Sequence, residues 1–269
     1  MRRVLPLLLV LVAVLALGCQ ESGFDEKKET SKPLKVQHAL GESKVPGQAE
    51  EPLTLTVDTL DDALALDVRP ARAAVPRTQL PAYLRDAGRG VSLMRPVTAG
   101  DLAAAEAVHP DLILGRAEEQ EKIYDDLSRI APTVMTDGGG GQWKLNLRLV
   151  GEGLGRTNDA EQLLTDYDRE AAEARRPIDG RPSVAVARMT ADGLRYAPRD
   201  SFAGTILADA GVKQVAGRGA DVLLLSSAPG AQASVGGRST RVDEALWWGA
   251  GGALAARAAL ADLQRALAA

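Results

Sequence analysis

The sequence has very little cysteine, histidine or aromatic content. Its 269 residues include one Cys and two His, and Phe, Trp and Tyr together make up 3%. A single Cys excludes an intramolecular disulfide, so any folded domain has to be held together by its apolar core. So few Cys and His also disfavour the cluster of N, O and S ligands that bare zinc or manganese requires. We therefore expect no protein-built metal site and no bound cofactor.

Two functional classes lack support as well. The net charge of -4 argues against a nucleic-acid partner. The chain contains neither a Gly-x-Ser-x-Gly nor a His-Glu-x-x-His motif. Two His leave little for general base chemistry, so we do not expect an enzyme.

The N-terminus has the pattern of a lipoprotein signal. Two arginines precede an apolar run, Val4–Leu17, and Gly18 and Cys19 follow. The run is too short to span a bilayer comfortably. A small residue followed by Cys is where bacterial lipoprotein signals are cleaved. We expect residues 1–19 to be such a signal, with a lipid (palmitate) on Cys19; an ordinary signal peptide with an incidental Cys is the alternative.

The remaining chain begins with a polar tether and continues as an α/β pattern. Residues 20–35 are charged and polar, with almost nothing to bury. Beyond them strands and helices alternate, which favours mostly parallel sheets. The expected strands are 53–57, 71–75, 111–114, 131–135, 183–188 and 222–225, and the expected helices are 59–66, 101–108, 118–129, 201–210 and 253–267.

One longer helix is expected in the middle of the chain. Asn158 and Glu161 form a capping pair, and an apolar stripe continues to Ala174 before Pro177 ends the pattern. At a rise of about 1.5 Å per residue, such a helix crosses a small domain. We expect residues 158–177 to bridge an N-terminal lobe, 36–157, and a C-terminal lobe, 178–269.

Several motifs, in order along the chain, match one known family. They are Val36-Gln37-His38-Ala39-Leu40-Gly41-Glu42 with Val45-Pro46-Gly47, His109-Pro110-Asp111-Leu112-Ile113-Leu114, Tyr124 to Val134 with Leu127-Ser128 and Ile130-Ala131-Pro132-Thr133-Val134, Leu154-Gly155-Arg156, Ser201 to Leu207, and Val242 to Leu263. From Val36 to the C-terminus the chain resembles siderophore-binding proteins of the ferrichrome and ferric-citrate type. Each motif is weak alone, but their order makes the resemblance specific.

The resemblance implies a fold, a ligand and partners. The fold is two Rossmann-like lobes joined by one long backbone helix, the class III periplasmic-binding-protein fold, with the ligand in the cleft between the lobes. The function is capture of a ferric siderophore for an ABC importer; haem or cobalamin is the alternative ligand. The protein would be a lipid-anchored monomer on the extracytoplasmic face of the membrane, serving an ABC permease.

The chain departs from this family in ways that bear on transport. Relatives carry a Glu on each lobe that docks onto the permease, and Ala103 stands at the first of these positions. Asp101 and Glu106 are the nearest acids, and we find no counterpart in the second lobe. The Gly-, Ala- and Ser-rich segment 225–241 is also short. A binding or sensor lipoprotein that kept the fold without transport is therefore an alternative function.

The expected binding residues follow from the chemistry of a chelate that already encloses its iron. Such a ligand needs cations to offset its charge and aromatic surfaces to pack against. Sheets of this type bind at the carboxyl ends of strands. The candidates are Arg116, Arg188, Trp143, Tyr196, Arg199 and Trp247. The alternatives are surface charge for the arginines and lobe packing for the tryptophans.

Three further features receive structural interpretations. The Gly138–Gly141 run lacks the Lys-Ser/Thr of a phosphate loop, so we expect a loop flanking the cleft. The paired acids Asp61 and Asp62 are attributed to helix N-terminal charge. His38 and His109 are expected to be structural.

Overall fold

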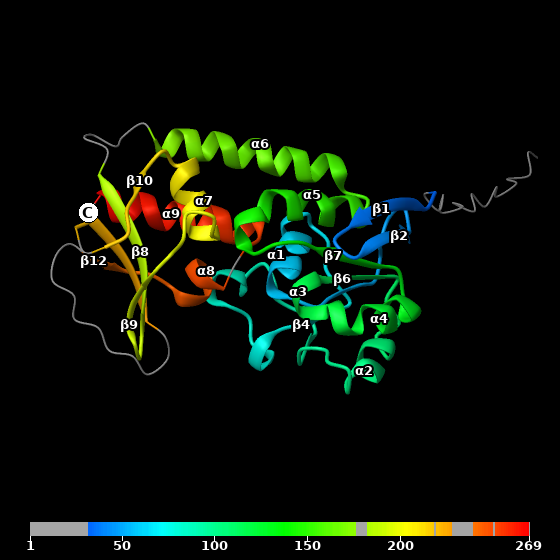
Figure 1. Cartoon of the computed structure of the whole chain (residues 1–269). Helices are drawn as coiled ribbons and strands as arrows, with labels where there is room; N and C mark the ends of the chain where they lie inside the picture. Colours follow the sequence, from blue (N-terminus) through cyan, green and yellow to red (C-terminus); the bar gives the residue numbers. More distant parts are fainter. Residues whose placement is uncertain (1–31, 176–181, 218, 228–238, 250, 269) are drawn as a thin grey trace, which may run out of the picture.

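The computed structural model describes residues 32–175, 182–217, 219–227, 239–249 and 251–268 (Figure 1). The predicted signal, Cys19 and most of the predicted tether lie outside these residues. An antiparallel hairpin, β1 (Leu34–His38) and β2 (Gly41–Val45), precedes two separate five-stranded sheets. The first has the order β5-β4-β3-β6-β7, and the second has the order β10-β8-β11-β12 with β9 beside β8.

The first sheet is wholly parallel, and helices cover both of its faces. Successive strand residues point to opposite faces, so Leu112 and Leu114 join the core that contains α5, whereas Ile113 joins the cluster that contains α2 and α4. The strands are β3 (Pro52–Thr54), β4 (Arg72–Ala74), β5 (Leu93–Met94), β6 (Leu112–Arg116) and β7 (Thr133–Thr136). The helices are α1 (Val57–Ala65), α2 (Leu102–Glu106), α3 (Ala117–Gln120), α4 (Tyr124–Ile130) and α5 (Trp143–Gly153), with single 3-10 turns at Pro76–Thr78, Ala82–Leu84, Glu121–Ile123 and Gly140–Gln142.

The second sheet is parallel except for β9. Val184 and Val186 face the main core with α7 and α9, whereas the cluster on the other face, with Ala185 and Ala187, contains no residue of a described helix. The strands are β8 (Ser183–Thr190), β9 (Gly193–Tyr196), β10 (Lys213–Gln214), β11 (Val222–Ser227) and β12 (Ser239–Arg241). The helices are α7 (Phe202–Asp209), α8 (Glu244–Trp248) and α9 (Ala253–Ala268).

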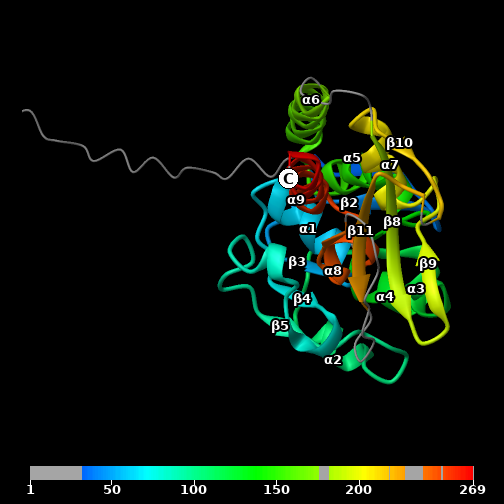
Figure 2. The same cartoon turned by 90° about the vertical axis from the view of Figure 1, so that its left-hand side faces the viewer.

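The long helix expected between the two halves is α6, and it runs without a break over Thr157–Ala174. Its buried stripe includes Ala160, Leu164, Tyr167 and Ala171. Figures 1 and 2 both show α9 alongside α6. Both helices contribute to one apolar core that also includes residues of the two sheets, so the halves share a common interior. Among the described residues, no helix is long and apolar enough to cross a membrane.

One predicted helix is wrong in its continuity. Residues 118–129 were expected to form a single helix, but α3 ends at Gln120 and a 3-10 turn separates it from α4. The side chain of Gln120 turns back to the strand before it, where its Oε1 accepts a hydrogen bond from the Arg116 backbone N–H at 2.8 Å. This contact ties the short helix α3 to the carboxyl end of β6.

The glycine run after β7 lies against the second half of the molecule. A Cβ on Gly141 would stand 1.9 Å from the carbonyl oxygen of Asp200, just before α7, and one on Gly251 would stand 3.1 Å from Cα of Gly140. Glycine is therefore needed here because two backbones approach closely. The run therefore lies at the junction of the two halves, whereas its predicted place beside the ligand cleft stays a prediction, because it does not line the candidate pocket described below.

Replacing Gly141 with alanine will lower the free energy of unfolding by about 1–3 kcal/mol, because the added methyl group forces Asp200 away. Gly139→Ala is the matched control: its Cβ would meet nothing within 4 Å, and its φ of -67° suits alanine. Urea denaturation of both variants checks this. Equal stability of the two variants would contradict the close approach.

Candidate functional site

The strand orders place a crevice at the carboxyl end of each sheet. In the first sheet the order reverses between β3 and β6, and in the second it reverses between β8 and β11. Open α/β sheets bind ligands at such switch points, where neighbouring connections leave in opposite directions. β3 leads into the start of α1, β6 ends at Arg116, and Arg188 lies near the carboxyl end of β8.

A pocket of about 340 Å³ lies between elements of the two halves. One wall comes from Val57 at the start of α1 and from the segment Pro76–Arg85 that follows β4. The other wall is α8 and its flanks, where Asp243, Ala245 and Gly249 contribute. This volume lies within the range of small-ligand pockets, and its position between two α/β halves makes it the candidate binding site.

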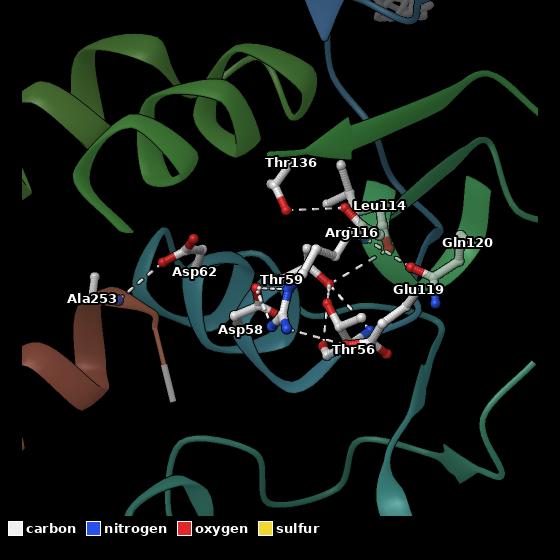
Figure 3. A network of polar contacts seen from close by, with 11 residues as sticks. Thr56, Asp58, Thr59, Asp62, Leu114, Arg116, Glu119, Gln120, Thr136 and Ala253 are labelled. Atoms are coloured by element: carbon white, nitrogen blue, oxygen red, sulfur yellow. Dashed lines mark hydrogen bonds and ion pairs between the residues drawn. The ribbon is translucent and has the colours of Figure 1, made fainter. Parts of the chain in front are cut away.

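Arg116 reaches the pocket wall through Asp58, the residue after Val57. Asp58 Oδ2 accepts hydrogen bonds from Nη2 of Arg116 at 2.7 Å and from its Nε at 3.1 Å, and Glu119 Oε1 lies 3.1 Å from Nη1 (Figure 3). Burial alone would lower the pKa of Arg116, but these carboxylates raise it overall. Asp58 and Glu119 therefore already form ion pairs with the guanidinium group that was predicted to bind the ligand, and Arg116 in turn holds Asp58 in place.

Arg188 does not line the pocket itself but contacts α8, which forms the opposite wall. Its Nη1 donates to Glu244 Oε1 at 3.1 Å, and its guanidinium carbon stands 4.7 Å from the ring centroid of Trp248. Glu244 also accepts a hydrogen bond from Ser226 Oγ at 2.5 Å. Nε of Arg188 is buried without a partner among the described residues. The guanidinium thus keeps hydrogen-bonding capacity beside the pocket residues Asp243 and Ala245.

Two of the expected aromatic contacts are core residues. Trp143 and Trp247 are each 1% exposed, and neither lines this pocket, although Trp143 lines a separate hollow of about 180 Å³ between α5 and α7. Trp143 stands edge-on to Tyr167 of α6, with ring centroids 4.7 Å apart, and Trp247 Nε1 donates to Asp262 of α9 at 3.3 Å. Packing between helices accounts for both positions, and a ligand contact at either residue stays a prediction.

Tyr196 and Arg199 are not brought to the pocket either. Tyr196 pairs with Ala187 across β8 and β9, so its side chain shares the outer face with Ala187 and not the face of Arg188. Arg199 is exposed and lines a separate hollow of about 220 Å³ with Lys213 and Gln214. The register of a short antiparallel strand, which the sequence pattern did not predict, separates these residues from the site.

The sequence interpretation missed Arg77 and Arg85, and it selected Trp247 in preference to its neighbour Trp248. The two arginines line the pocket, and Trp248 carries Arg188 on its ring. A signal for Arg77 was available, because it closely follows the strand 71–75 that was itself predicted. The rule that selected Arg116 from the end of its strand also selects Arg77.

Two buried acids tie the walls of the pocket together. Asp62 Oδ1 accepts from Ala253 N at 2.9 Å (Figure 3), and the two oxygens of Asp61 accept from Leu254 N at 2.7 Å and from Ala255 N at 3.0 Å. These N–H groups form the first turn of α9. Burial raises the pKa of Asp61 to about 7, although the backbone hydrogen bonds act to lower it.

The attribution of these acids to charge at the N-terminus of their own helix is wrong, because α1 begins at Val57 and the acid in its first turn is Asp58. They lie within α1 but complete the N-terminus of α9, where orphan N–H groups need acceptors. These hydrogen bonds join α1 to α9. Because α1 contributes to one wall of the pocket and α9 directly follows α8 of the other wall, they hold the two walls together.

Comparison with known proteins agrees with this architecture. Residues 102–235 match the family described as periplasmic binding protein. The probable siderophore-binding lipoprotein YfiY of Bacillus subtilis (strain 168) is 30% identical over 212 residues, which is 77% of this chain and 65% of that protein. The achromobactin-binding periplasmic protein of Dickeya dadantii (strain 3937) is 29% identical over 167 residues, 59% of this chain and 54% of that protein. The chain therefore spans less than two thirds of the length of these two curated relatives.

A solved structure extends the likeness over most of the chain. Staphylococcus aureus SirA complexed with staphyloferrin B matches with a TM-score of 0.75 and 25% identity, and covers 87% of this chain and 98% of SirA. A periplasmic solute-binding protein of Mycobacterium smegmatis str. MC2 155 matches with a TM-score of 0.74 at 18% identity, covering 88% of this chain and 98% of that one, which shows the fold alone. The predicted α/β fold is confirmed.

Proposed function

We propose that the chain is a periplasmic binding protein that captures a ferric siderophore between its two halves and delivers it to an ABC-type importer, as its match to that family over residues 102–235 supports. The observation that carries this proposal is the pocket between α1 and α8, which lies beside the two sheet switch points. Among the described residues, no three His, Cys, Asp or Glu side chains gather as metal ligands. A pocket that offers cations without such ligands suits a chelate that brings its own iron coordination.

The names of the relatives support the ligand class. One relative is named a siderophore-binding lipoprotein, another an achromobactin-binding protein, and SirA was solved with staphyloferrin B. We propose that this chain likewise acts outside the cytoplasm, as a monomer that the lipid on Cys19 holds at the membrane. We also propose the division into lobes 36–157 and 178–269 with the bridging helix 158–177 between them.

Docking to a permease belongs to the same proposal. Ala103, at the position where relatives carry a docking Glu, lies on α2, and Glu106 follows three residues later on the same helix. Both residues are exposed, and residues three apart share one helix face. We assign the docking role of the first lobe to Glu106. A binding lipoprotein that does not dock is the competing function, and uptake of a bound chelate by cells that carry Glu106→Ala separates the two.

Arg188→Ala will weaken binding of the ferric siderophore by about tenfold or more, because a charge-assisted contact in a partly buried cleft is worth about 1.5–3 kcal/mol. Titration of the purified protein with a panel of ferric siderophores, followed by tryptophan fluorescence, measures this. Arg265→Ala is the control, since Arg265 lies in the last turn of α9 with a side chain that is 71% exposed.

Arg116→Ala tests whether Arg116 binds the ligand directly or only supports the α1 wall of the pocket. It will leave the buried Asp58 unpaired and will lower the free energy of unfolding by about 3 kcal/mol. Its effect on affinity will follow from movement of the α1 wall and will be smaller than that of Arg188→Ala.

If Arg188→Ala binds a confirmed ligand as tightly as Arg265→Ala does, the site lies elsewhere.

A further inference from the structure

The polar lining of the pocket is dominated by guanidinium and amide groups. Arg77, Gln79 and Arg85 come from the wall after β4, and Asp243 comes from the wall of α8. The remaining lining is aliphatic or backbone and contains no aromatic ring: Val57, Pro76, Leu80, Pro81, Ala82, Ala245 and Gly249. The nearby Trp248 already has the guanidinium of Arg188 on its ring, 4.7 Å from the centroid. The pocket therefore offers donor groups and apolar surface but no free aromatic face.

The two arginines of this wall are available to a ligand. Both are exposed, and neither forms an ion pair with a described residue, unlike Arg116 and Arg188 nearby. Asp243, the one acid of the lining, is the N-cap of α8 and accepts the N–H of Leu246 at 2.9 Å. Its Oδ1 is occupied by this bond, and it forms no ion pair with the opposing guanidinium groups, so these keep their N–H donors free.

The backbone that carries Arg77 is strained. Arg77 and Thr78 have φ values of 55° and 52°, in the left-handed region that non-glycine residues seldom occupy. For the β-branched Thr78 this conformation is a genuine outlier. Such strain persists only where the surroundings impose it, and it gathers at ligand-binding segments. Here it fixes the path of the chain at the rim of the pocket, where it presents Arg77.

We propose that Arg77 and Arg85 select a ferric chelate that exposes carboxylates over one built from catecholate rings or neutral hydroxamates. The proposal rests on the function proposed above and names the substrate class of the same site. Guanidinium forks match the two oxygens of a carboxylate. Catecholate rings pack best on aromatic faces, which this lining does not offer. Hydroxamate chelates that carry no net charge gain little from paired cations.

The test compares three probes on the full-length protein: ferric citrate, a ferric tris-catecholate and a neutral ferric trihydroxamate. Each is titrated by fluorescence at one ionic strength. We expect ferric citrate to bind at least about tenfold more tightly than the other two. Arg77→Lys and Arg85→Lys keep the charge but lose the fork, so each will weaken ferric citrate by about tenfold. Arg195→Lys is the control, because Arg195 is exposed on β9 and does not line the pocket.

The outcomes separate this inference from the proposed function. If the catecholate or the hydroxamate binds as tightly as ferric citrate, or if both lysine variants behave like Arg195→Lys, the carboxylate selection is overturned while siderophore binding stands. If none of the three chelates binds, the proposed function and this inference both fall.

Discussion

Asp61→Ala will lower the free energy of unfolding by about 3–5 kcal/mol, because it leaves two buried N–H groups of α9 without acceptors. The groups are those of Leu254 and Ala255, and Asp61 itself is fully buried. Urea denaturation of the variant measures the loss. The effect is expected to exceed that of an ordinary helix cap, since water cannot replace the carboxylate at a buried helix end.

Asp159→Ala is the matched control for Asp61→Ala. Like Asp61, Asp159 stands at the N-terminus of a helix, here in the first turn of α6, but its side chain is 56% exposed, so its loss will amount to less than about 1 kcal/mol. The pH gives a second readout. A carboxyl whose pKa is raised in the folded state stabilises fully below its unfolded pKa of about 3.9 and loses this contribution as the pH rises through about 7. The loss caused by Asp61→Ala will therefore be larger at pH 5 than at pH 8; the reverse order would show that the carboxylate is stabilised as a charge.

Alanine at Trp247 will mainly lower the stability of the protein, whereas alanine at the adjacent Trp248 will mainly lower its affinity for the ligand. Trp247 is 1% exposed and packs in the shared core, so Trp247→Ala will lower the free energy of unfolding by about 3–5 kcal/mol. Trp248 is partly exposed and carries the Arg188 guanidinium. Trp248→Ala will cost about 1 kcal/mol in stability but will release Arg188, and ligand affinity will fall by about tenfold.

Each variant serves as the control for the other, because Trp247→Ala is expected to change mainly stability and Trp248→Ala mainly ligand affinity. Denaturation measures the stability of both, and titration with the ferric chelate that binds the native protein measures affinity, followed by iron absorbance since a fluorophore has been removed. A Trp247→Ala variant that loses affinity in the folded state, together with a Trp248→Ala variant that keeps it, would return Trp247 to the binding site.

Much of the fold could be predicted because its signals are local. The strands β6, β8 and β11 are short apolar runs, and α6 has both a cap signal and a continuous stripe. The elements that were missed differ in this respect. β9 spans four residues and is defined only by pairing with β8, a tertiary contact that no local pattern contains. α5 was missed although its buried residues Trp143, Leu147 and Val150 repeat at helical spacing.

The site could be predicted only in part, for a related reason. Arg116 and Arg188 were proposed because the carboxyl end of a parallel strand is a position that can be read from sequence. Their acidic partners Asp58 and Glu244 are 58 and 56 residues away, so the pairing that constrains each arginine was not visible. Trp247 and Trp248 are equally apolar in the sequence, and only the packing of α8 decides which is buried.

The contact between α1 and α9 also constrains the order in which the molecule can be completed. The acceptors lie near residue 60, and their donors come 191 to 194 residues later. Until the last helix has been synthesised, two carboxyl groups in the interior of the first half have no backbone donors. Contacts this distant in sequence form late and slow folding. A fragment that ends before Ala253 is therefore expected to leave even its N-terminal half unfinished.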